Sequence, residues 1–510
     1  MNKMYKVFVM LLVLVIGVFS FVACNPNTGN TGDGGNGGNG GNGGGDLPNA
    51  DTMKYAQVYT TTGTMSKLMM RDTSLEFVDY DDSSYNTMVT VDVENTYQNF
   101  YGYGASLTHS SAYLLMQEGA EDVRREMLNE LFGPDGARFN FIRLPIGSSD
   151  YIEGDKFFTC CDLADPSGED PGMLSFNLDH DQNIIAVLKE IIAINPDIKI
   201  IAVPWSAPAW MKDNGNLIGG SLAEEHETAF ADYLVKFVNE YKRLGIKITH
   251  LSLVNEPFVP VLAYPTMRMD GLQAARIVKI LGPKLEKLDH KVDILGWDHN
   301  VNNIGSYLDE LYGDEEASKY VTGTAFHGYG GDYTEACTDW SEVYPDKELY
   351  LTEITEHSGS NDFARNISYA AQQVTIAPVN LGSNGAMFWN YVLRSDGTPS
   401  PVGHGSACYG VMDMDYIDGE YVYNKSSAYY AMAHISKFAY KVNGQDPKAL
   451  RVESSNDTMI IACALYRADG KIIVAVCNIS DVLSENVDIV IGDKCVTYNV
   501  LPQSIVTFVC

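Results

Sequence analysis

Positive charge is scarce in this chain. It carries 35 lysine and arginine residues against 66 aspartate and glutamate residues, which gives a net charge of −31 at pH 7. A protein with this charge repels a phosphate backbone, so the composition argues against nucleic acid as a partner. The same charge suits a soluble, exported protein that acts on neutral substrates.

Motifs for metals and cofactors are absent as well. The nine cysteines include no C-x-x-C pair and no metal-ligand spacing, so we expect no required disulfide. Gly102-Tyr103-Gly104 lacks the third glycine and the acidic partner of a dinucleotide fingerprint. His226 stands in an acidic stretch without H-E-x-x-H spacing, where the start of a solvated helix is the expected role. The sequence therefore predicts no cofactor and no metal.

The first 23 residues have the pattern of an export signal. Lys3 and Lys6 form a short basic segment, and residues 7–23 are apolar but too short to indicate a membrane span. The stretch ends in Phe21-Val22-Ala23-Cys24, which resembles a bacterial lipoprotein cleavage box with phenylalanine in place of the usual leucine. We therefore expect a signal peptide over residues 1–23 and a lipid on Cys24, at the bacterial cell surface or periplasmic face. Secretion after ordinary cleavage is the alternative.

Both ends of the remaining chain are rich in strand patterns. Residues 24–51 consist mostly of glycine and asparagine and are expected to form a flexible linker. Residues 52–97 and 431–510 contain short alternating runs with turn signals between them, typical of antiparallel strands with one wet face. Each end is too small for a good sandwich, so we expect the two to combine into one side β-sandwich domain.

Between residues 98 and 430, apolar runs alternate with amphipathic helical stretches. Eight runs have the character of buried strands, namely 100–106, 139–145, 199–205, 248–256, 293–300, 323–329, 348–353 and 386–391. Eight β/α units that close on themselves form a (β/α)8 TIM barrel. The count of eight, and the polar residue near almost every strand end, favour this fold over an open doubly wound sheet.

Two of these runs end on a glutamate. The fourth run ends in Asn255-Glu256-Pro257, and a proline cannot donate to a sheet ladder. The seventh run ends on Glu353. Two carboxylates at the mouth of one barrel predict a glycosidase site, although a strand-ending role for each is the structural alternative. Glu356 is a rival to Glu353, but strand alternation places the two on opposite sides.

The other strand ends supply groups that suit sugar binding. Carboxylates and amides bind hydroxyl groups, and indole rings cover the apolar face of a pyranose. We expect substrate contacts from one set of residues, with Arg143 in a supporting role that keeps a nearby carboxylate ionised. The set comprises Asp150, Trp205, Asn255, His327, Tyr329, Trp389 and Asn390.

These residues lie in motifs that resemble glycoside hydrolase family 30, the glucosylceramidase family. The resemblance runs in order through Phe100-Tyr101-Gly102-Tyr103-Gly104-Ala105-Ser106, Ile142-Arg143-Leu144-Pro145, Pro204-Trp205-Ser206-Ala207-Pro208-Ala209-Trp210, Asn255-Glu256-Pro257, His327-Gly328-Tyr329 and Thr352-Glu353. In that family the fourth barrel strand carries the acid/base and the seventh the nucleophile. The resemblance thus implies that Glu256 is the acid/base and Glu353 the nucleophile of a retaining reaction.

Further roles follow from the same resemblance. The two carboxyl groups of a retaining enzyme lie about 5–5.5 Å apart. Asn255 is expected to bond the 2-hydroxyl of the sugar, and Tyr329 and His327 to tune the two carboxylates. No metal is needed for this chemistry.

The family alone leaves the sugar open. Phe326-His327-Gly328-Tyr329-Gly330-Gly331-Asp332 resembles the bacterial β-1,6-glucanase branch, whereas glucosylceramidases tend to have tryptophan where this chain has Gly328. We expect a carbohydrate substrate, with endo-acting cleavage of a β-1,6-glucan ahead of glucosylceramide, an exo-β-glucosidase or a β-xylosidase activity. A hypothesis of another class is a non-catalytic glycan-binding surface lipoprotein.

Overall fold

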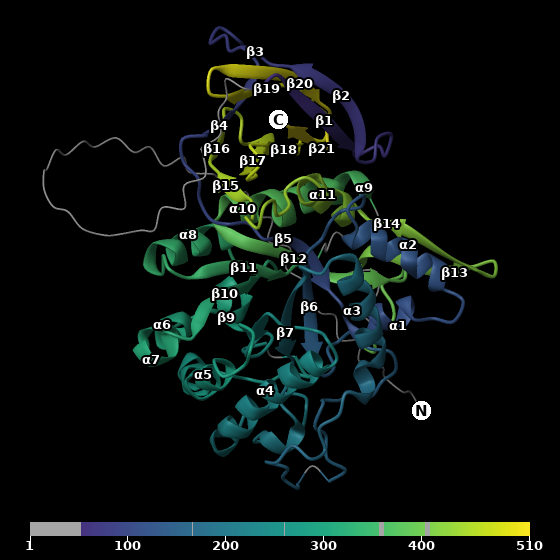
Figure 1. The fold of residues 1–510 in the computed structure, drawn as a ribbon, viewed down its shortest axis with the longest axis vertical. Helices are drawn as coiled ribbons and strands as arrows, with labels where there is room; N and C mark the ends of the chain where they lie inside the picture. Colours follow the sequence, from purple (N-terminus) through teal and green to yellow (C-terminus); the bar gives the residue numbers. More distant parts are fainter. Residues whose placement is uncertain (1–52, 166, 260, 356–361, 403–407) are drawn as a thin grey trace, which may run out of the picture. The chain divides into compact units, whose positions relative to one another are not determined.

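A closed ring of parallel strands forms the centre of the protein. The computed structural model describes residues 53–165, 167–259, 261–355, 362–402 and 408–510. Eight consecutive parallel strands pair in the order β11-β10-β9-β8-β7-β6-β5-β12, and the β11–β12 pairing closes the ring (Figure 1). They are β5 (Gly102–Ser106), β6 (Phe141–Ile146), β7 (Lys199–Pro204), β8 (His250–Ser252), β9 (Asp293–Asn300), β10 (Val321–His327), β11 (Glu348–Glu353) and β12 (Ser383–Leu393). The predicted TIM barrel is confirmed.

Side chains of one strand face fill the inside of this ring. Six of them form a separate buried cluster, each from a different strand: Phe141, Ile201, Leu295, Ala325, Tyr350 and Met387. Successive side chains on a strand point to opposite faces, so the neighbouring positions pack outward against the helices. The interior of the barrel is therefore a packed core, and its chemistry is confined to the strand ends.

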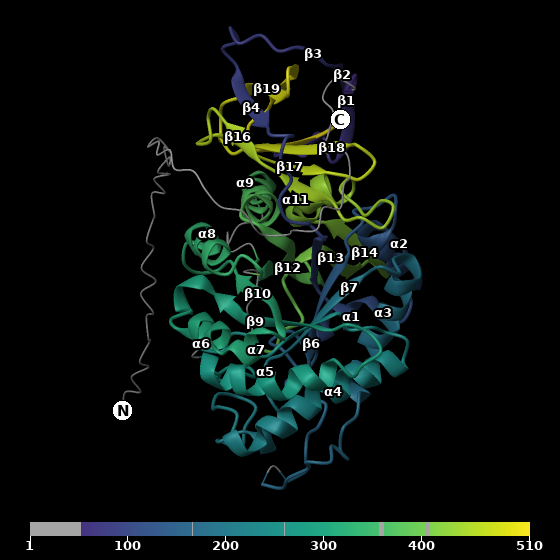
Figure 2. The same cartoon turned by 60° about the vertical axis from the view of Figure 1, so that its left-hand side comes forward.

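Helices cover the outside of the ring (Figures 1 and 2). Their bounds are α1 (His109–Leu115), α2 (Glu121–Phe132), α3 (Gln182–Ile194), α4 (Glu227–Arg243), α5 (Gly271–Leu285), α6 (Tyr307–Gly313), α7 (Glu315–Ser318), α8 (Tyr333–Val343), α9 (Phe363–Ala370), α10 (Ala377–Asn380) and α11 (Ser427–Ser436). Side-chain caps define several of the starts; Asp270, for example, accepts from the Gln273 amide at the start of α5. The amphipathic pattern predicts helices over residues 122–131, 184–194, 227–244 and 272–288, and α2 to α5 are found at these places.

The fourth strand is much shorter than predicted. The run over residues 248–256 forms a ladder only at β8, His250–Ser252, and the chain then leaves the strand conformation. Glu256 has a φ of +48°, and a residue in this left-handed region cannot continue a ladder. Its amide donates instead to the Asp298 carbonyl oxygen at 3.0 Å. The turn that carries Asn255 and Glu256 is thus attached to the neighbouring strand end by backbone bonds.

Two further sheets combine both ends of the described chain. One has the order β15-β17-β18-β21-β1-β2 and the other β16-β4-β19-β20-β3. The N-terminal strands are β1 (Tyr55–Thr62), β2 (Met70–Glu76), β3 (Val78–Asp79) and β4 (Thr87–Val91). The C-terminal strands are β15 (Lys448–Leu450), β16 (Val452–Ser454), β17 (Ile460–Tyr466), β18 (Ile472–Asn478), β19 (Glu485–Ile491), β20 (Lys494–Val500) and β21 (Ser504–Val509). One apolar core contains residues of both sheets, as the predicted side sandwich requires.

The sandwich contacts the barrel through α11. His434 of this helix lies 2.8 Å from the Thr507 hydroxyl of β21 and 2.9 Å from the Thr61 hydroxyl of β1. Both figures show purple N-terminal and yellow C-terminal strands side by side above α11. The hairpin of β13 (Gly410–Ile417) and β14 (Glu420–Lys425) extends the barrel sheet beyond β12 and was not predicted.

Some predictions fall on residues that the structure does not describe. The signal peptide, the linker, Cys24 and Glu356 lie outside the described residues. The eight cysteines that are described are all free thiols. None of the helices in the described part of the chain has the length and apolar character that crossing a bilayer requires.

Candidate active site

A fully buried arginine holds the ends of several barrel strands together. Arg143 lies in β6, where it faces Ile201 of β7. Its guanidinium donates to Glu353 Oε2 at 2.5 Å, to Asn255 Oδ1 at 2.6 Å and to Asp298 Oδ2 at 3.2 Å. The planar fork of arginine suits such divergent contacts, which a lysine could not make. One cation thus links the ends of β6, β9 and β11 with the turn after β8.

Glu353 is the last residue of β11 and lies within this network. It accepts a second hydrogen bond at Oε1 from the Tyr329 hydroxyl, at 3.1 Å. Burial raises the pKa of Glu353 to about 7, against the opposing charges of His327 and Arg143. The charge of Glu256 adds to this rise in pKa, so the two predicted catalytic carboxyls lie within electrostatic reach of each other.

Glu256 faces two histidines. Its Oε1 lies 3.2 Å from His327 Nδ1 and 3.5 Å from His299 Nδ1. Burial alone would raise the pKa of Glu256, but hydrogen bonds from His299 and His327 outweigh it and lower the pKa to about 2. In the unliganded protein Glu256 is therefore the more acidic of the two glutamates.

His327 bridges Glu256 and a second buried carboxylate. Its Nε2 lies 3.2 Å from Asp298 Oδ1, which also accepts a 2.5 Å hydrogen bond from the Thr352 hydroxyl. Burial alone would lower the pKa of His327, but the charge of Glu353 and the contacts with Asp298 and Glu256 raise it to about 9. His327 is thus cationic at neutral pH and fully buried between two carboxylates.

A strand irregularity positions Asp298. Trp297 and Asp298 both have positive φ values, 71° and 68°, where the register of β9 against β10 slips by one residue. Such a bulge re-aims side chains at the rim of a barrel. Asp298 points at Arg143 and His327, and His299 points at Glu256. Asp298 stands near a strand end that the sequence pattern picks out, but it was given no role of its own, and His299 was not among the predicted site residues. A sequence pattern inside a strand gives no signal of a bulge.

Aromatic rings line one side of the carboxyl pair. Trp205 and Trp389 stack with ring centroids 5.4 Å apart, and the Arg143 guanidinium lies 4.9 Å from the Trp205 ring centre. Tyr151 packs edge-on to Trp389, and Tyr264 packs against the same cluster. Such a platform can cover the apolar face of a sugar ring. The two tyrosines were missed because they lie in loops without a periodic pattern.

The structure brings most of the predicted site residues together. The negative charge of Asp150 acts on Glu353, so Asp150 is near the pair. Asn390 is fully buried, and its Oδ1 accepts from the Thr108 hydroxyl at 2.8 Å, so that oxygen already has a protein partner. β12 continues to Leu393, and its register against β5 shifts between Phe388 and Asn390.

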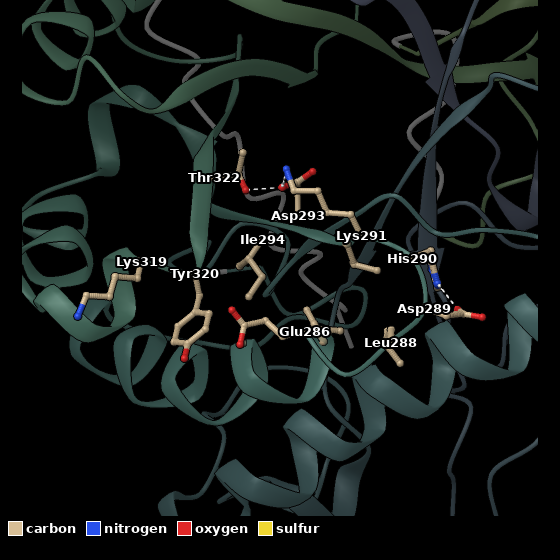
Figure 3. A pocket seen from close by; sticks show the side chains of 13 residues that line it. Glu286, Leu288, Asp289, His290, Lys291, Asp293, Ile294, Lys319, Tyr320 and Thr322 are labelled. Atoms are coloured by element: carbon tan, nitrogen blue, oxygen red, sulfur yellow. Dashed lines mark hydrogen bonds and ion pairs between the residues drawn. The ribbon is translucent and has the colours of Figure 1, made fainter. Parts of the chain in front are cut away.

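A pocket at the opposite end of the barrel is separate from this site. Figure 3 shows the pocket, of about 640 Å³, between the end of α5 and the first residues of β9 and β10. Its lining includes Asp293 and Thr322, joined by a 2.6 Å hydrogen bond. The carboxyl pair lies at the carboxyl ends of the strands, which is where TIM-barrel enzymes carry their active sites.

Removing the central cation is expected to destabilise the protein strongly. Arg143→Met leaves the buried carboxylates of Glu353 and Asp298 without their partner, which should lower the free energy of unfolding by about 3–5 kcal/mol. Urea denaturation followed by tryptophan fluorescence measures this loss. Arg125→Met is the matched control, because Arg125 pairs with Asp122 at the surface. Equal midpoints for the two variants would contradict the expectation.

Comparison with known proteins adds to this geometry. The model of the glycosyl hydrolase family 30 TIM-barrel domain matches residues 100–439. An endo-1,6-beta-D-glucanase of Aspergillus fumigatus is 30% identical over 362 residues, which cover 67% of this chain and 70% of that protein. A putative glucosylceramidase of Caenorhabditis elegans is 28% identical over 377 residues, or 70% of this chain and 69% of that protein. The solved structure of an endo-beta1,6-glucanase has a TM-score of 0.77 at 28% identity, and covers 89% of this chain and 98% of that chain.

Proposed function

Because this chain belongs to glycosyl hydrolase family 30 and is a glycoside hydrolase, we propose that it cleaves β-1,6-linked glucan with retention of configuration. The observation that supports the retaining mechanism is the pair of carboxyl groups, Glu256 and Glu353. Glu353 accepts hydrogen bonds from Arg143 and Tyr329, whereas Glu256 faces His299 and His327. Two carboxyls in unlike surroundings can take the two unlike roles that a retaining mechanism requires.

In the first step Glu353 acts as the nucleophile. Its ionised oxygen forms a bond to the anomeric carbon, while the bond from that carbon to the glycosidic oxygen breaks. The one proton of the pair, which rests on Glu353 in the unliganded protein, passes to Glu256 when the sugar binds. Glu256 then donates it to the departing oxygen, which leaves as an alcohol. Arg143 and Tyr329 orient the Glu353 carboxylate for this attack, since each donates to a different oxygen.

In the second step Glu256 acts as the base. It takes a proton from a water molecule, whose oxygen then attacks the anomeric carbon and releases Glu353 as a carboxylate. The free sugar keeps the β configuration because two inversions have occurred. The Oδ1 atom of Asn255 already accepts a hydrogen bond from Arg143. Its amide N–H groups remain as donors to a sugar hydroxyl.

The proton count of the site predicts the pH dependence. The pKa of Glu256 is lowered to about 2 and that of Glu353 is raised to about 7, so one proton resides on the pair between these values. The reaction needs that proton, so kcat/KM should fall about tenfold per pH unit above about pH 7. A pH–rate profile on soluble glucan measures this, with recovery at pH 6 as the control for stability. A plateau up to pH 9 would instead assign the catalytic proton to His327, whose pKa is raised to about 9.

The choice of β-1,6-glucan depends on the relatives and on Gly328. Two proteins that are called endo-1,6-glucanases match at 28–30% identity, one by sequence and one by structure. A Cβ atom at Gly328 would lie 2.5 Å from the Ile354 Cδ1 atom, so a side chain there would require Ile354 to move. The tryptophan typical of glucosylceramidases at this position would displace Ile354. Glucosylceramide remains the second candidate, because glucosylceramidase relatives match at 28% identity.

Product analysis tests the substrate. The purified protein is incubated separately with β-1,6-glucan, β-1,3-glucan, xylan and glucosylceramide, and the products are separated by chromatography. We expect short β-1,6-linked oligosaccharides from the first substrate alone, with the β anomer formed first by NMR. Glucose released only from glucosylceramide would overturn the proposal, and an α anomer formed first would overturn the retaining mechanism.

We also propose that the protein is exported and anchored through a lipid on Cys24. The support is the composition of residues 3–24, a basic start followed by an apolar run that ends at a cysteine. A lipid and a glycine-rich spacer would hold the enzyme at a surface where it contacts polysaccharide. Metabolic labelling with a palmitate analogue tests this, and a label that persists in Cys24→Ser would contradict it.

A further inference from the structure

Three side chains at the site form a cluster with the character of a metal site. Glu256, His299 and His327 each present one ligand atom, and the three atoms lie within 4.8 Å of one another. They come from three separate places in the chain, namely the turn after β8, the end of β9 and the end of β10. The side-by-side pairing of β8, β9 and β10 therefore assembles the cluster, and no short sequence motif encodes it.

The spacing of the ligand atoms suits zinc. Zn²⁺ binds imidazole nitrogen and carboxylate oxygen at about 2.0–2.1 Å in tetrahedral geometry, which separates neighbouring ligand atoms by about 3.4 Å. Glu256 Oε1 lies 3.2 Å from His327 Nδ1 and 3.5 Å from His299 Nδ1. Two distances between ligand atoms thus match those of a tetrahedral zinc site. Glu256 is the most exposed of the three side chains.

The surroundings of His327 also match those of a zinc ligand. Its second nitrogen lies 3.2 Å from Asp298, and Thr352 holds that carboxylate by a hydrogen bond. Histidine ligands of zinc commonly donate their other N–H group to a carboxylate in this way, which fixes the ring and raises its basicity. Nδ1 of His327 is then the nitrogen that faces Glu256.

The local charge favours a divalent cation. Four carboxylates, including that of Glu256, lie in the cluster or near it, and Arg143 contacts two of them. Binding of the ion requires neutral imidazoles, so His327 would release the proton that it carries in the unliganded protein. The four carboxylates and Arg143 then have a formal charge of −3, which a divalent ion would reduce. The four carboxylates are Asp150, Glu256, Asp298 and Glu353.

We propose that Glu256, His299 and His327 bind Zn²⁺ and that the bound ion reversibly inhibits the enzyme. The ion would occupy the oxygen of Glu256 that otherwise gives and takes the catalytic proton. The inhibitory half of this proposal rests on the proposed function, whereas the binding half rests on the geometry alone. Zinc is thus an inhibitor of this enzyme and takes no part in its reaction.

Cobalt spectroscopy tests the binding half without any assay of activity. The full-length protein is dialysed against chelator and titrated with Co²⁺, whose visible absorption is strong in tetrahedral sites. We expect a band at one equivalent in the wild type, which added Zn²⁺ displaces. His299→Phe and His327→Phe should each lose the band or weaken the affinity by on the order of 100-fold. Glu256→Gln should weaken it in the same direction, with little change of shape.

His290→Phe is the matched control. His290 lies beside the exposed Asp289 at the opposite end of the barrel, so its loss should leave the cobalt band unchanged. Near-ultraviolet circular dichroism checks that each variant is folded. A wild type without a band, or a band that survives both His299→Phe and His327→Phe, would overturn the site.

Activity then tests the inhibitory half. Micromolar Zn²⁺ should suppress hydrolysis in the wild type, and chelator should restore it. Displacement of the cobalt band by Zn²⁺ without loss of turnover would overturn the inhibition and leave the site standing. A protein that hydrolyses none of the offered glycosides contradicts the proposed function, while the cobalt titration still decides whether the site exists.

Discussion

Replacing Glu353 with glutamine should lower kcat on β-1,6-glucan by on the order of 10⁴-fold or more. Glutamine keeps the shape of the side chain, and its single amide oxygen can still accept from one of the two donors, Arg143 or Tyr329. It cannot form the covalent bond to the anomeric carbon. Initial rates at saturating glucan, measured by reducing-sugar release, give the change. The matched control is Glu348→Gln at the other end of the same strand, where Glu348 contacts Tyr101 and Tyr350.

A nucleophile variant also has a chemical signature. In Glu353→Ala, azide can fill the vacated space and attack an activated aryl β-glucoside directly. A single inversion then gives the α-glucosyl azide, which NMR identifies. If Glu353→Gln keeps more than about a tenth of the wild-type kcat, or if azide yields the β product, Glu353 does not hold the nucleophilic role.

Replacing Glu256 with alanine should produce a loss that depends on the leaving group. General acid catalysis contributes about 10²–10⁴-fold, and only to leaving groups that need a proton. The first step on a dinitrophenyl β-glucoside should therefore stay close to the wild-type rate, while hydrolysis of glucan falls by that factor. Stopped-flow measurement of dinitrophenol release separates the two steps. Added azide should yield the β-glucosyl azide, the opposite anomer to that expected for Glu353→Ala.

The positive φ at Glu256 does not change the interpretation of this test. Its φ of +48° is strained for any residue with a Cβ atom, and alanine carries the same Cβ atom as glutamate. A change in thermal stability of Glu256→Ala would thus report lost side-chain contacts with the two histidines. If both substrates lose the same factor, Glu256 is a binding residue and the acid lies elsewhere.

Much of the barrel follows from local sequence patterns. The apolar runs at β9 and β11 coincide with the predicted ranges, and the end of β11 puts Glu353 where the pattern indicates. Strands that are buried on both faces read as continuous apolar runs, which is why they could be recognised. β8 was predicted too long because residues that are buried without a ladder have the same apolar character.

The fourth and eighth strands show where pattern reasoning fails. Glu256 was placed at a strand tip, yet a left-handed turn carries it and the Asp298 carbonyl holds that turn. The eighth run was predicted to end at residue 391, yet β12 runs two residues further, to Leu393. Since side chains alternate with a period of two, an error of a few residues in a strand boundary decides which side of the barrel a residue faces.

The amino-acid sequence by itself determined the eight-strand order, the side sandwich from both chain ends and the two glutamates, because each depends on local periodicity and on which residue ends a run. The tertiary structure alone decided the partners of those glutamates. Arg143 lies on β6, Asp298 and His299 lie on β9, and His327 lies on β10; the folded barrel brings these residues to the two glutamates. Proton affinity depends on burial and on charges a few ångströms away, so the distribution of protons between Glu256 and Glu353 is a property of the folded site.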